Sequence, residues 1–537
     1  MKGEYLKKMQ KKISFIVKAS QEFFRHTDEE EKINAPVINK FFESISNVYI
    51  PLLNMLEKFE TEGNNFCFSI VMPPVLCNLL GSNSLQENYI KWLENKNLLG
   101  QKELIRNKDN PKILSLIQDE ISKNTQLKNQ FADKYQKRLL PVFKYYMQKG
   151  MIEILGTCGT DIFLPHYIDL PEIISAEIET GLYSYKKVFG TIPEGFWLCE
   201  KGYFEGLENI IKAYGYSYTI VDSRSFLLAE NIPENGTYRP CRIGNFVLFA
   251  DDYYVEKEFF GEKGLIFNKK YLNLNSDIGF ELDIDSLSPV MQEGTLRFST
   301  GYTYLSRDVS QNDGCIYDKA AACAQVVEDA EHFLEAHSSR LNKMCQEDIK
   351  TDFYIDVCTF DLERLSKNWF EFTDFFENVI VLLKKYDIEN VSCSSLCENP
   401  SVYQKIIPYF SSGCGEGYGE NLLSSKNSWM MRYINKACVR MIDLAERFPS
   451  DSGLKNRLLN LGAQELLLCL SSKLAQYIDE SDFLEFAERR FKESIIAFTY
   501  VFDALGSNTV STEWLTRIEA KDSVFPWMNY KIFAKKK

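Results

Sequence analysis

The sequence contains few histidines and no surplus of basic residues. The four histidines among 537 residues are His26, His166, His332 and His337. They leave little for a histidine-rich metal site or a Ser-His-Asp triad, so we expect no metal ion. Acidic residues outnumber basic ones by 75 to 62, which gives a net charge of -13. This balance argues against a nucleic-acid partner, whose phosphates require a basic face.

Long apolar runs and paired cysteine motifs are also missing from the sequence. Residues 1–12 are charged and lack the apolar segment of a signal peptide, and no run reaches the roughly 20 apolar residues of a membrane span. The 14 cysteines are scattered apart from the close pair Cys393 and Cys397, and no two such pairs form a zinc pattern. We therefore expect reduced thiols, a cytoplasmic location and no membrane partner.

Ordinary apolar and charged contents of 45% and 26% are typical of a globular protein. The chain is long enough for a large barrel and one further domain. Aromatic residues are frequent, at 14%. Most of their rings belong in a core, and the remainder can line a sugar-binding cleft, where flat apolar faces stack well.

Short apolar segments alternate with helical patterns over the first 400 residues. This alternation favours an α/β fold, and we predict a seven-stranded β/α (TIM-like) barrel. The predicted strands are residues 13–18, 66–72, 152–157, 195–199, 217–222, 353–360 and 390–394. Helices are predicted between them, among others over residues 170–189 and 319–340.

Two long stretches interrupt this alternation, and a purely helical region follows it. Residues 82–150 are helical and charged, which indicates inserted helices or a lid. Residues 223–310 are too long for an ordinary connection and predict a functional excursion over the barrel mouth. A Gly/Ser-rich loop near residue 415 divides a barrel domain, 1–415, from an all-α domain, 416–537, whose predicted helices are 429–448, 455–478 and 483–505.

Residues 195–199 form an apolar segment that ends in Glu200, and a helical pattern over 204–215 follows. A carboxylate at the carboxyl end of a barrel strand faces the usual position of the active site. The alternative is an acid that caps the next helix or lies in solvent.

A second apolar segment, residues 353–360, ends in Asp361 and Glu363. Strand-end carboxylates from two βα units can converge over one barrel mouth. Glycoside hydrolysis requires such a pair, with one group to protonate the leaving oxygen and one to attack or to activate water.

Taken together, several collinear segments resemble glycoside hydrolase family 57, and within it the 1,4-α-glucan branching enzymes that carry a helical C-terminal domain. The segments are residues 44–59, 72–80, 195–203 (GFWLCEKGY), 359–369 (TFDLERLSKNW), 418–433, 457–472 and 522–530. The resemblance implies a seven-stranded barrel followed by a helical bundle. It implies an α-1,4-glucan or oligosaccharide substrate and no cofactor. It also makes Glu200 the matching nucleophile and Asp361 the matching general acid/base of a retaining reaction.

Several positions that normally hydrogen-bond or stack on the sugar differ from the family pattern. Lys18-Ala19-Ser20 stands for His-x-His, Thr160-Asp161 for Thr-His, Ser366-Lys367-Asn368-Trp369 for Gly-His-Trp-Trp, Ser472-Lys473-Leu474 for Ser-Asp-Trp, and Ser412-Gly413-Cys414-Gly415 for an SSWG-like turn. Cys199 and Lys201 flank the nucleophile where Pro and Cys are common. Lys201 and Lys367 thus flank the expected catalytic pair, Glu200 and Asp361. Each lysine either points at this pair or lies in solvent.

Substrate-binding candidates follow from the same motifs. They are Trp369, Tyr203, His26, Asp161, Lys367 and Trp429. Among the rings we expect Trp369 in the cleft, and Trp197, which lies mid-strand, in the core.

Three functional hypotheses remain open. The first is a retaining 1,4-α-glucan branching enzyme, with a hydrolase of short α-glucans close to it. The second is a catalytically weak or inactive paralogue that binds glucan or a partner protein. The third is an enzyme for another sugar polymer, with its subsites rebuilt around Lys18, Asp161 and Lys473. The oligomeric state is not predicted.

Overall fold

Seven parallel strands among the described residues form a ring in the computed structural model. The structure describes residues 9–24, 31–64, 66–311, 314–347, 351–521 and 523–536. The ring strands are β1 (Gln10–Lys18), β2 (Phe68–Val71), β3 (Ile152–Leu155), β4 (Gly195–Trp197), β5 (Tyr218–Val221), β7 (Phe246–Ala250) and β8 (Phe353–Asp361). Strands β3, β2, β1 and β8 pair in one sheet, and β4, β5 and β7 pair in another. All of these pairings are parallel.

Two contacts join the sheets into a barrel. A parallel bridge pairs Gly156 with Phe196, between the ends of β3 and β4. On the other side the Asp252 N–H donates to the Val357 carbonyl oxygen at 2.8 Å, which connects the end of β7 to β8. The predicted fold class, a seven-stranded β/α barrel, is confirmed.

One strand of the ring differs from the prediction. Residues 390–394 were predicted as the seventh strand, but β9 (Glu389–Asn390) pairs only with Lys12 and Ile13 at the start of β1. The seventh ring strand is β7, which lies inside the stretch predicted as one excursion. A short strand over residues 245–250 was expected, but as part of the excursion and not of the ring. Its five residues are all buried. On its other side it forms an antiparallel hairpin with β6 (Cys241–Ile243), which β10 (Gln404–Lys405) extends.

The barrel has an apolar interior because alternate residues of each strand point inward. The interior cluster consists of Ile16, Val71, Leu155, Trp197, Tyr218, Ile220, Val247, Phe249, Phe353, Ile355 and Val357, together with Cys393 and Tyr403. Trp197 is 4% exposed, so its predicted core position is confirmed. Since residues on both faces are buried, these strands appear in the sequence as nearly continuous apolar runs.

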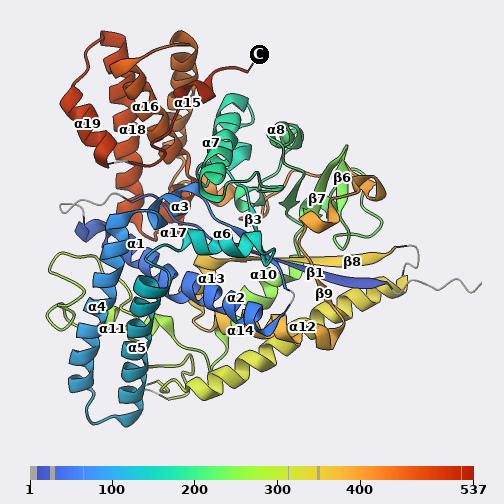
Figure 1. Cartoon of the computed structure of the whole chain (residues 1–537), viewed down its shortest axis with the longest axis vertical. Coiled ribbons are helices and arrows are strands. Elements are labelled where there is room, and N and C mark those ends of the chain that lie inside the picture. Colours follow the sequence, from blue (N-terminus) through green and yellow to red (C-terminus); the bar gives the residue numbers. More distant parts are fainter. Residues whose placement is uncertain are drawn as a thin grey trace, which may run out of the picture.

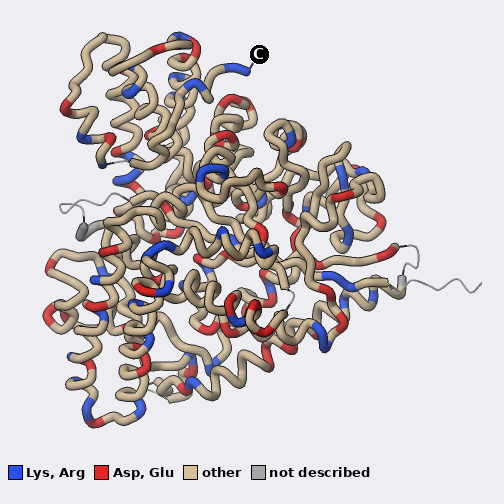
Figure 2. Tube along the Cα trace, viewed as in Figure 1, with Lys and Arg blue, Asp and Glu red and all other residues tan. Residues whose placement is uncertain are grey.

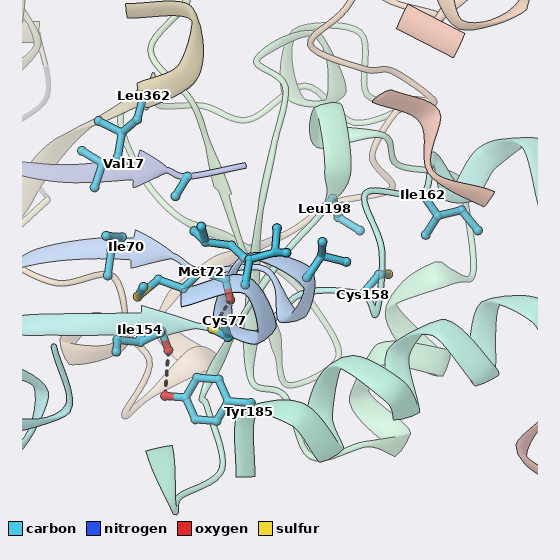
Figure 3. Close-up of a cluster of buried hydrophobic side chains, with 14 of the residues drawn as sticks. Val17, Ile70, Met72, Cys77, Ile154, Cys158, Ile162, Tyr185, Leu198 and Leu362 are labelled. Carbon is cyan, nitrogen blue, oxygen red and sulfur yellow. Dashed lines mark hydrogen bonds between the residues drawn. The ribbon is translucent and has the colours of Figure 1, made fainter. Parts of the chain in front are cut away.

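The outward faces of the strands pack against a layer of helices. Val17, Ile70 and Ile154, from three neighbouring strands, lie side by side in this layer (Figure 3). The Tyr185 hydroxyl donates to the Ile154 carbonyl oxygen at 2.9 Å. The covering helices are α1 (Glu31–Ser44), α2 (Ile50–Glu62), α3 (Pro74–Leu80), α7 (Pro171–Phe189), α8 (Leu207–Ala213), α12 (Lys319–Glu347), α13 (Leu362–Asn368) and α14 (Phe372–Leu382).

The stretch predicted as inserted helices is helical. Helices α4 (Asn83–Arg106) and α5 (Pro111–Asn129) form a pair at one edge of the molecule, and α6 (Leu140–Gln148) contacts β3 and α2 (Figure 1). The loop region after α10 (Tyr253–Phe260), which includes α11 (Ile278–Glu281), packs onto this pair. The Tyr302 hydroxyl donates to the Lys96 carbonyl oxygen at 2.9 Å, and the Tyr304 hydroxyl donates to Glu103 at 2.8 Å.

The C-terminal region is a bundle of helices beside one end of the barrel (Figure 1). Its helices are α15 (Trp429–Arg447), α16 (Gly453–Leu470), α17 (Ser472–Glu480), α18 (Leu484–Ser507) and α19 (Thr512–Lys521). The predicted helix 455–478 is broken at Ser471, whose ψ of 112° lies outside the helical region. The break lets the Ser472 N–H donate to the Asp161 carbonyl oxygen at 2.8 Å, so α17 starts at the barrel mouth.

Charged residues of both signs are interspersed along the chain, and several lie near the centre of the view (Figure 2). No helix among the described residues is both long and apolar enough to cross a bilayer. The domain boundary near residue 415 stays a prediction.

Candidate active site

The interior of the barrel changes from apolar to polar at the carboxyl ends of the strands. Ile16 belongs to the interior cluster, and Lys18 lies two residues further along β1 on the same face. Val357 is likewise followed by Thr359 and Asp361 on β8. Lys18 and Asp361 are partners in the β1–β8 register, so their side chains emerge side by side at this end.

Lys18 is a buried cation surrounded by three carboxylates. Its Nζ lies 3.7 Å from Glu200 Oε1, 3.9 Å from Asp361 Oδ2 and 3.9 Å from Asp161 Oδ2. The Lys18 side chain is 5% exposed. Burial alone would lower the pKa of Lys18, but Asp161, Glu200 and Asp361 together hold this pKa well above its usual value. The lysine is therefore charged, and it binds the ends of three different βα units together.

The two predicted catalytic carboxylates converge at this lysine. Because each has an oxygen within 4 Å of the same Nζ atom, these oxygens lie at most about 8 Å apart. Retaining glycosidases hold their carboxyl groups roughly 5 Å apart, a separation that this bound includes. The side chains of Glu200 and Asp361 are 22% and 30% exposed, so solvent reaches both. A packed apolar wall does not separate them.

Glu200 lies on a tight turn after β4. It has φ 50° and is followed by Lys201 with φ 51°, two consecutive left-handed residues that are not glycine. Such conformations cost about 1–3 kcal/mol each and persist where the surroundings enforce them. Here the Gly413 N–H donates to the Glu200 carbonyl oxygen at 2.6 Å. A Cβ on Gly413 would come within 2.4 Å of Lys201 Cε, so a larger residue here would displace the Lys201 side chain.

Asp361 ends β8 and caps the helix that follows. Its Oδ1 accepts a hydrogen bond from the Arg364 N–H at 3.0 Å, which makes it the N-cap of α13. Its other carboxylate oxygen faces Lys18. The cap fixes the side-chain rotamer and aims the free oxygen into the barrel mouth.

The two flanking lysines behave differently from each other. Lys201 points inward and forms an ion pair with Asp251, at the end of β7. Burial alone would lower the pKa of Lys201, but Asp251 and Asp222 raise it. Lys367 points outward, is 60% exposed and pairs with Asp482 of the helical region at 2.5 Å.

A second charged cluster, which we call the Glu363 cluster, lies beside the first. Glu363 accepts from Ser20 Oγ at 2.5 Å and from the Tyr477 hydroxyl at 2.9 Å. It also pairs with Lys40 at 2.5 Å and with Lys473 at 3.1 Å. Burial alone would raise the pKa of Glu363, but Lys40 and Lys473 hold it well below its usual value. The cluster joins the segment after β1 and the helices α1 and α13 to α17 of the helical region.

Two further groups complete the charged surroundings of the mouth. Glu22 pairs with Lys40 at 3.1 Å and lies 2.8 Å from the Tyr477 hydroxyl, whose single proton it shares with Glu363. Burial raises the pKa of Asp161, and this effect outweighs the opposing influence of Lys18 and Lys473. Acidic groups exceed basic ones here, as they do over the whole chain.

A cavity of about 910 Å³ opens next to the Glu363 cluster. Lys40 and Glu363 form part of its wall, and Ser366, Lys367 and Phe370 extend the wall from α13. The cavity continues between α5 and the loop over residues 272–304. This volume is typical of the clefts that hold several sugar-sized groups. Glu200 and Asp361 are not among the residues that line it.

Two of the predicted sugar-stacking rings lie in the core instead. Trp369 is 1% exposed and packs against Phe259, Tyr271 and Phe375. The expectation that it lies in the cleft is therefore wrong for this structure: the ring points inward, into an aromatic cluster under α14. Tyr203 is also 1% exposed, and its hydroxyl donates to Glu208 at 2.9 Å. Neither ring has a free face for a sugar.

The remaining predicted binding residues are dispersed. Asp161 lies in the mouth beside Lys18. Trp429 is half-buried in the bundle, with its ring against Phe491. Lys367 reaches the cavity wall. His26 lies outside the described residues.

Sequence reasoning did not find Lys40, Glu22 and Tyr477. They come from segments more than 400 residues apart, and no local motif marks them. The available signal was the charge pattern: Lys473 stands where the family pattern has Asp, and such a reversal calls for a buried acid within reach.

One group of described side chains has ligand atoms close enough to share a metal ion: Asp252, His337 and Cys358, all buried. His337 Nδ1, however, lies 2.7 Å from Asp356, and Arg340 pairs with Asp252 at 3.0 Å. The ligand atoms of His337 and Asp252 are thus engaged in ion pairs. We assign the group as a buried charge network between α12 and the β7–β8 contact, which we call the His337 network.

Sequence comparisons agree with this architecture. The sequence profile of glycosyl hydrolase family 57 matches residues 14–290, and the profile of the 1,4-alpha-glucan branching enzyme C-terminal region matches residues 433–533. The 1,4-alpha-glucan branching enzyme TK1436 of Thermococcus kodakarensis is 24% identical over 484 residues, which cover 84% of this chain and 67% of that protein.

Solved structures with the same fold include an amylase and a branching enzyme. The alpha-amylase AmyC of Thermotoga maritima superposes with a TM-score of 0.90 at 27% identity, covering 98% of this chain and 100% of AmyC. A GH57-type branching enzyme of Pyrococcus horikoshii superposes with a TM-score of 0.86 at 22% identity, covering 98% of both chains.

Proposed function

Because the chain belongs to glycosyl hydrolase family 57, we propose that it is a retaining enzyme of α-1,4-glucans, with Glu200 as nucleophile and Asp361 as general acid/base. The observation that carries this proposal is the convergence of both carboxylates on the Lys18 ammonium, from two separate strand ends. Both groups are partly exposed at a barrel mouth, where such folds place their chemistry.

In the proposed reaction Glu200 attacks the anomeric carbon and forms a glycosyl-enzyme intermediate. Asp361 gives its proton to the glycosidic oxygen of the departing chain. It then takes a proton from the incoming hydroxyl, which attacks the anomeric carbon and releases Glu200. The acceptor is a glucose 6-hydroxyl in branching and water in hydrolysis.

Branching is the first candidate activity. The match of residues 433–533 to the branching-enzyme C-terminal region supports it, as does the similarity to a curated branching enzyme. The helical region also reaches the mouth, since Ser472 contacts Asp161 and Lys473 pairs with Glu363. The likeness to the amylase AmyC makes hydrolysis the second candidate.

The residues that differ from the family pattern form ion pairs in the site. This supports a site that has been rebuilt with new charged residues and that remains functional. Lys18 and Asp161, both at positions where the family pattern has histidine, lie 3.9 Å apart. Lys473, at a position where the pattern has an acid, pairs with Glu363, whose side chain is only 13% exposed. A buried charge without a partner costs several kcal/mol, so such changes persist only in combination.

One observation favours the alternative of a catalytically weak glucan-binding protein. The Lys18 ammonium lies 3.7 Å from Glu200 and 3.9 Å from Asp361, so it takes up space near both groups that a sugar ring needs during attack. The variant Lys18→His, which restores the imidazole of the family pattern, separates the two readings. If Lys18 blocks the reaction, K18H should raise the turnover of amylose. If Lys18 belongs to a working site, K18H should lower it.

The direct test uses purified protein and amylose. Branching is expected to reduce iodine staining and to create chain ends that a debranching enzyme releases, with little new reducing sugar. Hydrolysis raises reducing ends in proportion to the lost staining. An inert protein that still binds amylose would refute glycosyl transfer and leave the binding alternative. Glu200→Gln serves as the matched control, because it keeps the shape of the side chain and removes the nucleophile.

A further inference from the structure

A small cavity lies beside the barrel mouth, between the segments that follow β1 and β3 and the helical region. Its volume is about 20 Å³, which is enough for one particle of the size of a water molecule. Four residues of its wall carry side-chain oxygens: Gln21, Glu22, Thr160 and Asp161. Apolar side chains form most of the rest, so the oxygens lie in a closed pocket of low polarity.

Two of these oxygens have no hydrogen-bond partner among the described residues: Gln21 Oε1 and Glu22 Oε1. The two residues are only 4% and 5% exposed. The other ends of both side chains are engaged, since Gln21 Nε2 donates to the Glu22 carbonyl oxygen at 3.3 Å and Glu22 Oε2 pairs with Lys40 at 3.1 Å. Buried polar atoms are nearly always satisfied, so the two oxygens indicate a bound particle that supplies the missing contacts.

The other oxygens of the wall are acceptors as well. Thr160 Oγ1 donates its proton to Glu177 Oε1 at 2.7 Å, so this oxygen can only accept from any further group. Asp161 adds a carboxylate, whose Oδ2 lies 3.9 Å from Lys18 Nζ. Arg490 also reaches the wall, but its guanidinium is paired with Glu465 at 3.2 Å. A group of acceptors in so small a space requires a positive charge or several donated protons.

We propose that Gln21, Glu22, Thr160 and Asp161 form a binding site for one monovalent cation of the size of Na⁺ or K⁺. Amide, hydroxyl and carboxylate oxygens are the ligands that hard cations prefer. Mg²⁺ keeps several water molecules, for which the cavity has no room, and Ca²⁺ takes about six to eight oxygens, more than these side chains offer. The scarcity of histidine, on which the expectation of no metal ion rested, does not bear on a site made of oxygens.

The charges around the cavity also favour a cation. The surrounding ion pairs involve the bases Lys18, Lys40, Lys473 and Arg490, and the more numerous acids Glu22, Asp161, Glu200, Asp361, Glu363 and Glu465. One bound monovalent cation reduces this excess of negative charge. Asp161 belongs both to the wall and to the carboxylates around Lys18, so the ion acts on a group beside the proposed catalytic pair.

The first test is thermal unfolding in NaCl, KCl and choline chloride at equal ionic strength, since choline is too large for the cavity. The wild type is expected to unfold about 2 °C higher in NaCl or KCl than in choline chloride. Gln21→Leu keeps the approximate size of the side chain, removes its oxygen and should abolish this difference. The matched control Gln86→Leu should keep it. Gln86 is another buried glutamine, on α4, whose Nε2 donates to the Leu80 carbonyl oxygen at 2.9 Å.

Equal unfolding temperatures of the wild type in the three salts overturn the inference. A salt effect that Gln21→Leu retains shows that cations act elsewhere, and it also overturns the inference. If Gln21→Leu does not fold, wild-type crystals soaked in thallium(I) acetate decide, because Tl⁺ replaces alkali cations and scatters anomalously. An anomalous peak in the cavity supports the site, and a cavity without one contradicts it. Neither measurement requires glucan turnover, so cation binding and the proposed function can fail separately.

Discussion

Two charged centres at the barrel mouth are built in opposite ways. At the first, one lysine faces three carboxylates at 3.7–3.9 Å, beyond hydrogen-bond range, and Glu200 and Asp361 remain partly exposed. At the second, Glu363 faces two lysines and two hydroxyls at 2.5–3.1 Å and its side chain is 13% exposed. The first centre has loose contacts and access to solvent. The second has short contacts and is less exposed to solvent, although it borders the cavity.

This difference indicates that the first centre is catalytic and the second is structural. A carboxylate held by four close partners keeps its charge and position, which suits a joint between the barrel and α17. A carboxylate with one long ion pair can approach a substrate and exchange a proton. We therefore place the chemistry at Glu200 and Asp361 and assign the Glu363 cluster to holding the helical region against the mouth.

Removing the nucleophile or the acid should have the largest effect. Glu200→Gln and Asp361→Asn are each expected to lower the turnover of amylose by at least about a thousandfold, because nucleophile and acid/base act in every cycle. The measurement is the initial rate of change in iodine staining, with circular dichroism to verify the fold. Activity of E200Q above a tenth of the wild-type value would show that another group attacks the sugar.

Glu363→Gln should break the second centre and destabilise the protein. Lys40 and Lys473 then lose their shared anion inside the protein, and we expect a loss of about 3–5 kcal/mol in the free energy of unfolding. Denaturant titration measures it, and proteolysis of the bundle reports loosening of α17. A loss below about 1 kcal/mol would mean that the cluster does not join the two regions.

The His337 network should make the free energy of unfolding depend on pH, with an effect of intermediate size. Burial alone would lower the pKa of His337, but the hydrogen bond to Asp356, the Glu258 carboxylate 3.6 Å from Nε2 and the charge of Asp252 raise it to about 9. Arg340 and Cys358 also face this group. Since the folded pKa exceeds the unfolded value of about 6.5, the stabilisation is complete below that pH and is lost as the pH rises through about 9.

The stabilisation that the His337 network contributes at low pH is on the order of 3 kcal/mol. Unfolding free energies measured at pH 6, 8 and 10 should therefore fall more steeply for the wild type than for His337→Asn, which carries no titrating ring. Parallel pH profiles for the two proteins would refute the assignment.

The smallest effect is expected at the exposed pair of Lys367 and Asp482, which also bridges the barrel and the bundle. Lys367→Ala should change the free energy of unfolding by less than about 1 kcal/mol, because solvent screens this contact. It is the matched control for Glu363→Gln in the same titration. If Lys367→Ala lowered the free energy of unfolding as much as E363Q does, the exposed pair and the Glu363 cluster would not differ in their contribution to stability.

The alternation of side chains made part of the site predictable. Strand-end residues follow the inward face by a period of two, so Glu200 and Asp361 could be placed at one mouth before their distance was known. Trp197 could be assigned to the core for the same reason. Long helices such as α7, α12 and α18 were also recognisable from apolar spacing and their terminal residues.

Other features depend on contacts that no local pattern encodes. Strand β7 is only five residues long and lies among loops, so it resembled an insertion. Trp369 follows a catalytic motif, but the geometry of α13 turns its ring toward Phe259 and Tyr271. The Glu363 cluster joins four distant segments, and its only trace in the sequence is a reversed charge at Lys473.

The most direct test of the catalytic pair is a trapped intermediate. The protein is incubated with a 5-fluoro-α-glucosyl fluoride, whose slow turnover lets a glycosyl-enzyme accumulate, and its peptides are analysed by mass spectrometry. The account predicts one fluoroglucosyl group on Glu200, which is missing from Glu200→Gln. A label on another carboxylate, or an unlabelled protein that still turns over amylose, would contradict it.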